Sequence, residues 1–258
     1  MTRPSPQSSK PAGAIVLAGL PVPRAGAFDP AWALVAGRPV CAWVVDTLAA
    51  APQMARVALV VDAPRLKRAQ ELIAASGWRN VRAVAATTTA RGANSAPQVA
   101  AWLGAGLAEL ASATRAEVAV VLHDATRPLL DPALLDALFA RWDGAGVVAA
   151  ASRVKETMKV VDERRRVLQT PPRDSLWQVR PPVLMPHSIL ERVLATAATP
   201  AAQQAASSAG IAALVARTPG IHLRLAPAGH DDLMVRRRAD LRVVERLLAA
   251  SGTQVPHG

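Results

Sequence analysis

Short apolar runs alternate with longer stretches of helical periodicity along most of the chain. The apolar runs predict strands at 14–19, 55–63, 81–86 and 117–125. The stretches between and after them predict helices at 38–51, 64–76, 96–111 and 131–143. Because nearly continuous apolar strands are typical of sheets covered on both faces, we expect a doubly wound, mostly parallel, Rossmann-like α/β fold. Ligands of such folds bind beyond the carboxyl ends of the strands.

Between residues 146 and 186 the pattern changes to strand-like pieces separated by polar turns. We interpret this part as a β-arm inserted at about 152–178 that projects from the sheet, with a hairpin turn near 162–165. Beyond the arm the pattern predicts a helix at 187–198, a strand at 221–228 and a last helix from about residue 239.

The chain is predicted to form one domain, over residues 13–250. Residues 1–12 are polar and proline-rich, which is typical of a disordered tail, and residues 251–258 are expected to form a second tail. The apolar run after the first tail is short for a secretory signal and fits a buried first strand better. No apolar run approaches the ~20 residues that a membrane span needs, so we expect no contact with a membrane.

The net charge points to anionic partners. The 258 residues carry a formal charge of +11, which suits nucleotides and phosphorylated metabolites. Nucleic acid is not expected, because the arginines are scattered and two Phe with no Tyr leave little material for a stacking platform. The single Cys41 excludes an internal disulfide and a multi-cysteine metal site, and a reducing, cytoplasmic setting is the natural interpretation.

The stretch "VLHDATRPLL" at 121–130 carries the first candidate chemistry. It places His123, Asp124 and Arg127 at the mouth of a strand that is otherwise apolar. A carboxylate there can hold a hydroxyl group or a metal ion, and a guanidinium can form a forked contact with a phosphate. Taken alone, the same residues also fit a helix-capping aspartate beside a solvated histidine. Together they favour a site for a phosphate ester.

Three blocks of the chain resemble a known family. They are "VLHDATRP" at 121–128, "ETMKVV" at 156–161 and "LQTPPRDSLWQVRPP" at 168–182. In this order they resemble the motifs of the 2-C-methyl-D-erythritol 4-phosphate cytidylyltransferases of the non-mevalonate isoprenoid pathway, over about residues 13–250. The resemblance implies a nucleotidyltransferase-like fold and transfer of CMP from CTP to the sugar phosphate, with Mg²⁺ as cofactor.

The resemblance also implies roles for single residues. The methylerythritol phosphate pocket would be lined by Asp124, Ala125, Arg127, Thr157 and Arg173. The nucleotide would be bound by Ala18, Gly19, Arg24, Arg91 and Ser95. Asp124 would also hold the metal, and the catalytic residues would be Arg24, Asp124 and Arg173. In the family the arm crosses to a partner subunit, so a homodimer is expected, in which Thr157 and Arg173 act across the interface.

The nucleotide half departs from the family motifs. The second glycine of the loop after the first strand falls at Pro21, which has no N–H to donate. One family lysine falls at Pro30 or Ala31, and a second falls at Met234. Arg236 shares a face with Met234 in an extended strand and is placed to substitute for it. Further candidate cations are Arg24 and Arg38.

Two functions therefore stay open. The first is a working, divergent cytidylyltransferase, or a related nucleotidyltransferase that uses another nucleotide, in which arginines replace the lysines. The second is a catalytically inactive family member that binds a sugar phosphate or a protein partner. A dinucleotide site is not expected, because "AGLPVPRAG" lacks the G-x-G-x-x-G spacing.

Overall fold

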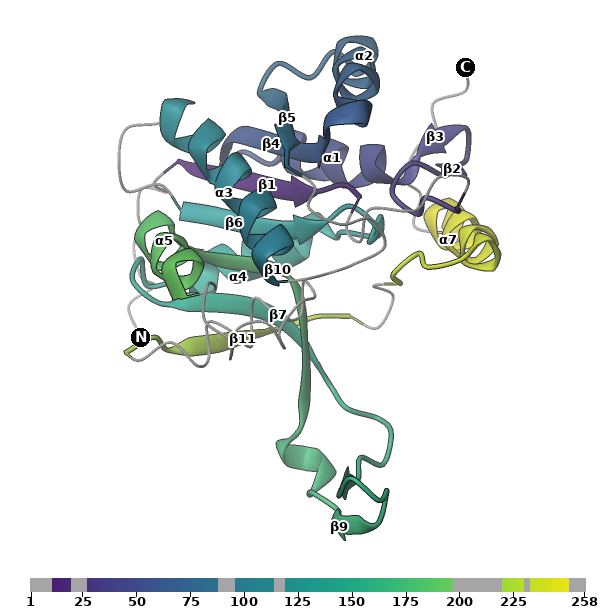
Figure 1. Ribbon diagram of the computed structural model, residues 1–258, viewed down its shortest axis with the longest axis vertical. Helices are drawn as coiled ribbons and strands as arrows, with labels where there is room; N and C mark the ends of the chain where they lie inside the picture. The colour runs from purple at the N-terminus through teal and green to yellow at the C-terminus, as the bar shows by residue number, and fades with distance from the viewer. Residues whose placement is uncertain are drawn as a thin grey trace, which may run out of the picture.

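The fold is built on one seven-stranded sheet, with strand order β11-β7-β10-β6-β1-β4-β5 (Figure 1). The computed structural model describes residues 11–19, 27–87, 96–113, 119–196, 220–229 and 233–250. Strands β1, β4, β5 and β6 run parallel, and only β10 runs antiparallel to its neighbours β6 and β7. The strands are β1 (Ala12–Leu17), β4 (Met54–Asp62), β5 (Val81–Ala86), β6 (Ala119–Asp124), β7 (Val147–Arg153), β10 (Trp177–Pro186) and β11 (Leu223–Pro227).

Helices cover both faces of this sheet, which confirms the predicted doubly wound α/β fold. On one face α1 (Val40–Ala50) packs against β4 and β1, α2 (Leu66–Ser76) against β5 and β4, and α4 (Pro132–Arg141) against β11 and β7. The even-numbered positions of β1 face this side. On the other face α3 (Ala96–Ala113) packs against β4, β1 and β5, and α5 (His187–Thr196) packs against β10, β6 and α3 (Figure 1). Ile15 and Leu17 of β1 face this side. No helix in the described part of the chain is long and apolar enough to span a membrane.

The last helix, α7 (Arg238–Ala250), lies at one end of the sheet. It packs through Val244 and Leu248 against Trp43 of α1 and against the small hairpin of β2 (Leu34–Val35) and β3 (Arg38–Pro39). The segment before the helix belongs to the same cluster through Val235. The C-terminal part of the chain therefore returns to the carboxyl edge of the sheet.

The predicted start of α4 is confirmed by local chemistry, whereas the predicted bounds of the first strand are not. Asp131 caps α4 by accepting a hydrogen bond from Ala133 N at 2.8 Å, and Pro132 occupies the first turn. The first strand was expected at 14–19 but ends at Leu17. It stops there because Gly19 adopts φ 134°, which lies outside the extended region that a strand needs.

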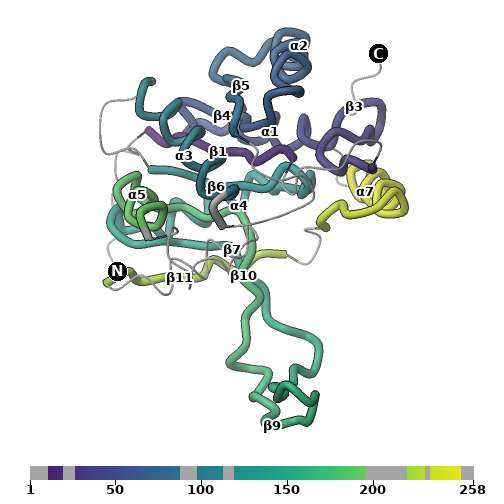
Figure 2. Tube along the Cα trace, in the orientation of Figure 1, coloured from purple at the N-terminus to yellow at the C-terminus, as the bar shows by residue number. Residues whose placement is uncertain are grey.

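The predicted arm projects from the body between β7 and β10 (Figure 1). Its elements are β8 (Val160–Val161), β9 (Val167–Gln169) and a short 3₁₀ helix, η2 (Arg173–Ser175). The hairpin turns at the predicted place, where the carboxylate of Asp162 accepts hydrogen bonds from the N–H groups of Arg164 and Arg166. Figure 2 shows the two chain runs of the arm leaving the sheet side by side.

Candidate functional site

The carboxyl ends of β1, β4 and β6 meet at one edge of the sheet. Ala18 N donates to Val60 O at 2.9 Å, and Ala125 N donates to Leu17 O at 3.1 Å. These two bonds hold the start of the loop after β1 between the ends of its neighbours. Ala18 and Gly19 therefore lie beside the turn that follows β6, as expected for a ligand site at this edge.

The turn after β6 is organised by Asp124. Its buried carboxylate accepts hydrogen bonds through Oδ1 from Thr126 N at 2.9 Å and from the Thr126 hydroxyl at 2.8 Å. Arg127 N donates to Asp124 O at 3.1 Å and closes the turn. Thr126 was missed by the sequence analysis, although an aspartate two residues before a threonine is a recognised turn pattern. The structure thus brings Asp124, Ala125 and Arg127 together in one rigid turn.

The segment before α7 is attached to the same turn. Val235 N donates to Thr126 O at 2.8 Å. Arg236 and Met234 lie together, with Arg236 Nε 3.3 Å from the sulfur of Met234. Arg236 therefore lies next to Met234, the position where the family has its second lysine. Arg38 is less available, because it pairs with Asp46 at 2.6 Å.

His123 faces the other side of the sheet from Asp124, because successive residues of a strand alternate between faces. It lines a cavity of about 790 Å³ together with Pro128, Leu129 and Pro182, and that cavity does not include Asp124. His123 Nε2 lies 3.3 Å from Arg127 O, a carbonyl that can only accept a hydrogen bond. Burial lowers the pKa of His123 from its ordinary 6.5 to about 4. The imidazole is therefore neutral at neutral pH and acts as a support for the turn.

Acidification is expected to destabilise the fold through His123. An unfolded histidine binds a proton near pH 6.5 and the folded one only near pH 4, so stability falls as the pH falls between these values. Each pKa unit corresponds to about 1.4 kcal/mol. The difference between the two pKa values of His123 therefore limits the loss of unfolding free energy to about 3 kcal/mol. Urea unfolding of the wild type and of His123→Gln, each at about pH 7 and about pH 4.5, should show a smaller pH dependence in the variant. Equal dependence in both proteins would contradict the assignment.

Thr157 and Arg173 lie on the arm rather than at this edge. Both are exposed, and Arg173 donates to Lys155 O at 3.2 Å. Because the arm projects away from the body, a single chain does not bring them to the turn after β6 (Figure 1). The nucleotide residues Arg24, Arg91 and Ser95 lie outside the described residues.

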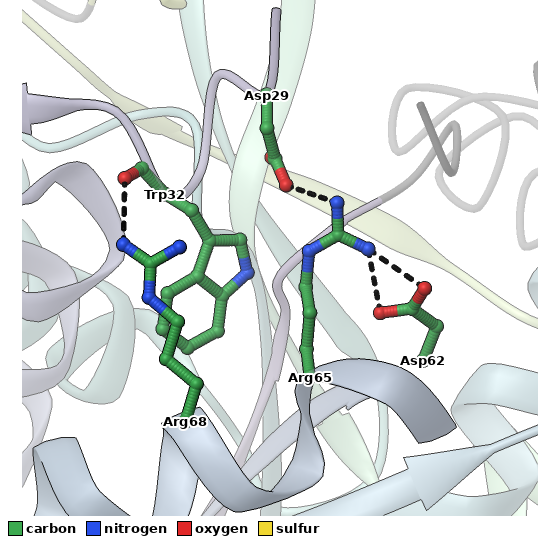
Figure 3. Close-up of polar contacts among 5 residues, drawn as sticks. All are labelled: Asp29, Trp32, Asp62, Arg65 and Arg68. Atoms are coloured by element: carbon green, nitrogen blue, oxygen red, sulfur yellow. Dashed lines mark hydrogen bonds and ion pairs between the residues drawn. The ribbon is translucent and has the colours of Figure 1, made fainter. Parts of the chain in front are cut away.

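A cluster at the end of β4 was not anticipated. Asp62, which is buried, accepts two hydrogen bonds at 2.7 Å from Arg65 Nη1, and Arg65 Nη2 forms an ion pair with Asp29 (Figure 3). We call Asp29, Asp62 and Arg65 the arginine clamp. Beside it, Arg68 lies over the ring of Trp32 at 4.8 Å and donates to Trp32 O at 3.4 Å (Figure 3). The only feature of the sequence that could have indicated this cluster was the three-residue spacing of Asp62 and Arg65.

Arg180 is a second cation that the sequence analysis missed. It lies on β10, is buried, and donates to Gly229 O at 2.8 Å. The sequence showed only an arginine before two prolines, which does not indicate burial. The contact ties β10 to the chain that follows β11.

The comparisons with known proteins agree on one family. The model of the 2-C-methyl-D-erythritol 4-phosphate cytidylyltransferase family matches residues 15–250. The Xanthomonas campestris protein of that name is 31% identical over 230 residues, which cover 87% of this chain and 79% of the relative. The one from Aromatoleum aromaticum is 34% identical over 152 residues, 58% of this chain, so the match spans only 60% of that relative's length.

Solved structures agree on the fold. The 4-diphosphocytidyl-2C-methyl-D-erythritol synthase of Anaerococcus prevotii superposes with a TM-score of 0.72 over 93% of this chain and 97% of its own, at 19% identity. The 2-C-methyl-D-erythritol 4-phosphate cytidylyltransferase of Thermus thermophilus gives 0.60 over 91% and 98%, at 16% identity. Since the family model spans nearly the whole described fold, this chain belongs to the 2-C-methyl-D-erythritol 4-phosphate cytidylyltransferase family.

Proposed function

We propose that the protein transfers CMP from CTP to 2-C-methyl-D-erythritol 4-phosphate. The observation that carries the proposal is the rigid turn from Asp124 to Arg127 beside Ala18 and Gly19, in a chain of this family. The turn carries an aspartate and an arginine at the edge where such sheets bind ligands. These groups suit the hydroxyls and the phosphate of the acceptor.

In the proposed reaction a phosphate oxygen of the acceptor attacks the α-phosphorus of CTP. The new P–O bond forms as the bond to the β-phosphate breaks, and pyrophosphate leaves with its electrons. This chemistry needs positioning and positive charge more than covalent help from the protein. Arg127 would hold the acceptor phosphate, and Asp124 would orient a hydroxyl group or a metal ion. Nucleotide binding is assigned to Ala18, Gly19, Arg24, Arg91 and Ser95.

The donor set suits a magnesium ion that arrives with the nucleotide. The described residues contain no group of three or more side chains that could form a complete protein site for a metal. Mg²⁺ is usually held by one or two carboxylates together with substrate phosphates, and Asp124 supplies one carboxylate at the proposed site. When bound, the ion would neutralise the charge that develops on the phosphates.

A homodimer through the arm would complete the site. Five of the seven large hydrophobic side chains exposed in the described residues lie on the arm: Met158, Val160, Val161, Val167 and Leu168. Clustered exposed apolar residues are typical of interaction surfaces. If the arm packs on a second copy, Thr157 and Arg173 of one subunit would reach the acceptor pocket of the other.

Leu168→Asp is expected to weaken this dimer. A charge on the apolar arm would raise the dissociation constant by ~30-fold or more, as at a typical interface hot spot. Sedimentation equilibrium of the wild type and the variant measures the effect. Leu34→Asp is the matched control, because Leu34 is about as exposed as Leu168 but lies on the body. A monomeric wild type, or equal weakening by both variants, would exclude an arm-mediated dimer.

A catalytically inactive protein is the second candidate. It is favoured by the absence of lysine at two positions, Pro30 or Ala31 and Met234, where the family has phosphate-binding lysines. Such a protein would bind a sugar phosphate or a protein partner without turning over CTP. Its setting, like that of the enzyme, is proposed to be the cytoplasm, where the single Cys41 would stay reduced. Cys41 is buried, and burial raises its pKa to about 12.

Calorimetry separates the two candidates. Purified protein would be titrated with CTP and Mg²⁺, and separately with methylerythritol phosphate, before pyrophosphate release is measured with both. CTP binding followed by pyrophosphate release supports the enzyme. Binding of the sugar phosphate without binding of CTP supports the inactive alternative and overturns the proposed activity.

A further inference from the structure

The two described segments that flank residues 20–26 are both attached to the end of β4. On one side Ala18 N donates to Val60 O. On the other side Asp29 is held by Arg65, which also holds Asp62 at the last position of β4 (Figure 3). One strand end thus fixes the distance between the two flanks of the loop that the family uses for nucleotide binding.

The rest of the second flank is fixed to the body. Ala33 N donates to Asp29 O at 3.0 Å, which makes a single helical turn, and Cys41 N donates to Ala31 O at 2.9 Å. Ala31 and Trp32 are buried. The ion pair between Arg65 and Asp29 therefore fixes the part of this flank that lies before Ala31.

Arg65 keeps its charge within the clamp. Burial lowers the pKa of Arg65, but the hydrogen bonds to Asp62 and Asp29 outweigh burial and raise the pKa overall. A planar guanidinium can serve two carboxylates at once, which a lysine cannot do with the same geometry. In the family this segment carries a phosphate-binding lysine. Here the segment is held by the ion pair between Asp29 and Arg65.

We propose that Arg65 is a positioning residue for nucleotide binding, because it holds Asp29, near the outer end of the flank 27–33, at the same end of β4 to which Ala18 is hydrogen-bonded. This inference rests on the proposed function. Binding of a nucleotide between pre-ordered flanks avoids the entropy cost of ordering them. The acceptor turn from Asp124 to Arg127 follows β6, on the opposite side of β1 from β4, and does not depend on the clamp.

The test is Asp29→Ala, which cuts the tie to the flank and leaves the buried pair of Asp62 and Arg65 intact. CTP affinity, measured by calorimetry with Mg²⁺, is expected to fall ~10- to 100-fold, the range that misplacement of binding groups produces. The affinity for methylerythritol phosphate should stay unchanged. Arg65→Lys keeps the charge but not the forked geometry. It should lower the CTP affinity less than Asp29→Ala does, and it should leave the affinity for methylerythritol phosphate unchanged. Glu71→Ala is the control, since it removes an acid from an exposed ion pair on the same helix region.

Amide hydrogen exchange distinguishes failure of this inference from failure of the proposed function. Peptides that cover residues 27–33 should exchange faster in Asp29→Ala than in the wild type and in Glu71→Ala, whether or not CTP binds. Suppose that exchange is faster in Asp29→Ala but the wild type does not bind CTP. The clamp would then be shown to order the flank, and both nucleotide binding and the proposed function would be overturned. Unchanged exchange, or equal loss of affinity for both ligands, would overturn the role of Arg65.

Discussion

Asp124→Asn is expected to lower kcat for pyrophosphate release ~10²- to 10³-fold, the usual cost of removing one pre-organised charged group. The asparagine keeps an oxygen that can accept the two hydrogen bonds from Thr126, so the turn should survive. What is lost is the negative charge that would orient a hydroxyl group or hold Mg²⁺. Steady-state kinetics of pyrophosphate release measure the change.

Asp131→Asn is the matched control for this variant. Asp131 caps α4 shortly after the same turn, and asparagine is an equally good cap. Its activity should therefore remain within about twofold of the wild type, since a good cap is retained. Retention of activity by Asp124→Asn, with the control also active, would remove the carboxylate from the proposed chemistry.

Trp102→Ala should produce the largest loss of stability, ~3–5 kcal/mol of unfolding free energy. Trp102 is fully buried on α3, and a side-chain carbon at Gly19 would lie 3.4 Å from its ring. Removal of the indole leaves a cavity directly beneath the start of the nucleotide loop. Denaturant unfolding should show the loss, and Trp102→Phe, which keeps a ring, should lose less than half as much. A loss below about 1 kcal/mol would mean that α3 collapses into the space.

The strands and helices could be predicted because their causes are local. The continuous apolar run of β6 and the cap formed by Asp131 and Pro132 are visible in the sequence and appear in the structure where they were expected. The arm was also visible, because its polar turns interrupt the pattern. The ends of strands were less predictable, since β1 ends at a backbone conformation of Gly19 that the letter alone does not specify.

The site could be predicted only in part, because its contacts join distant segments. Asp124 and Arg127 were recognisable from one stretch of sequence. The clamp between Asp29 and Arg65 depends instead on the parallel pairing of β1 with β4, which brings together residues 36 positions apart. Likewise, nothing in the sequence links Val235 to Thr126, whose hydrogen bond depends on where the chain returns after β11.

The strand order has a consequence for synthesis of the protein. β10 lies between β6 and β7, although it is made after both of them. Strands β1, β4, β5 and β6 can pair as soon as they leave the ribosome, but β7 has no neighbour until β10 arrives. Until then β6 is an open edge, the kind of surface on which nascent chains aggregate. The arm is the connection between β7 and β10, so the open edge of β6 persists until the ribosome has made the whole arm.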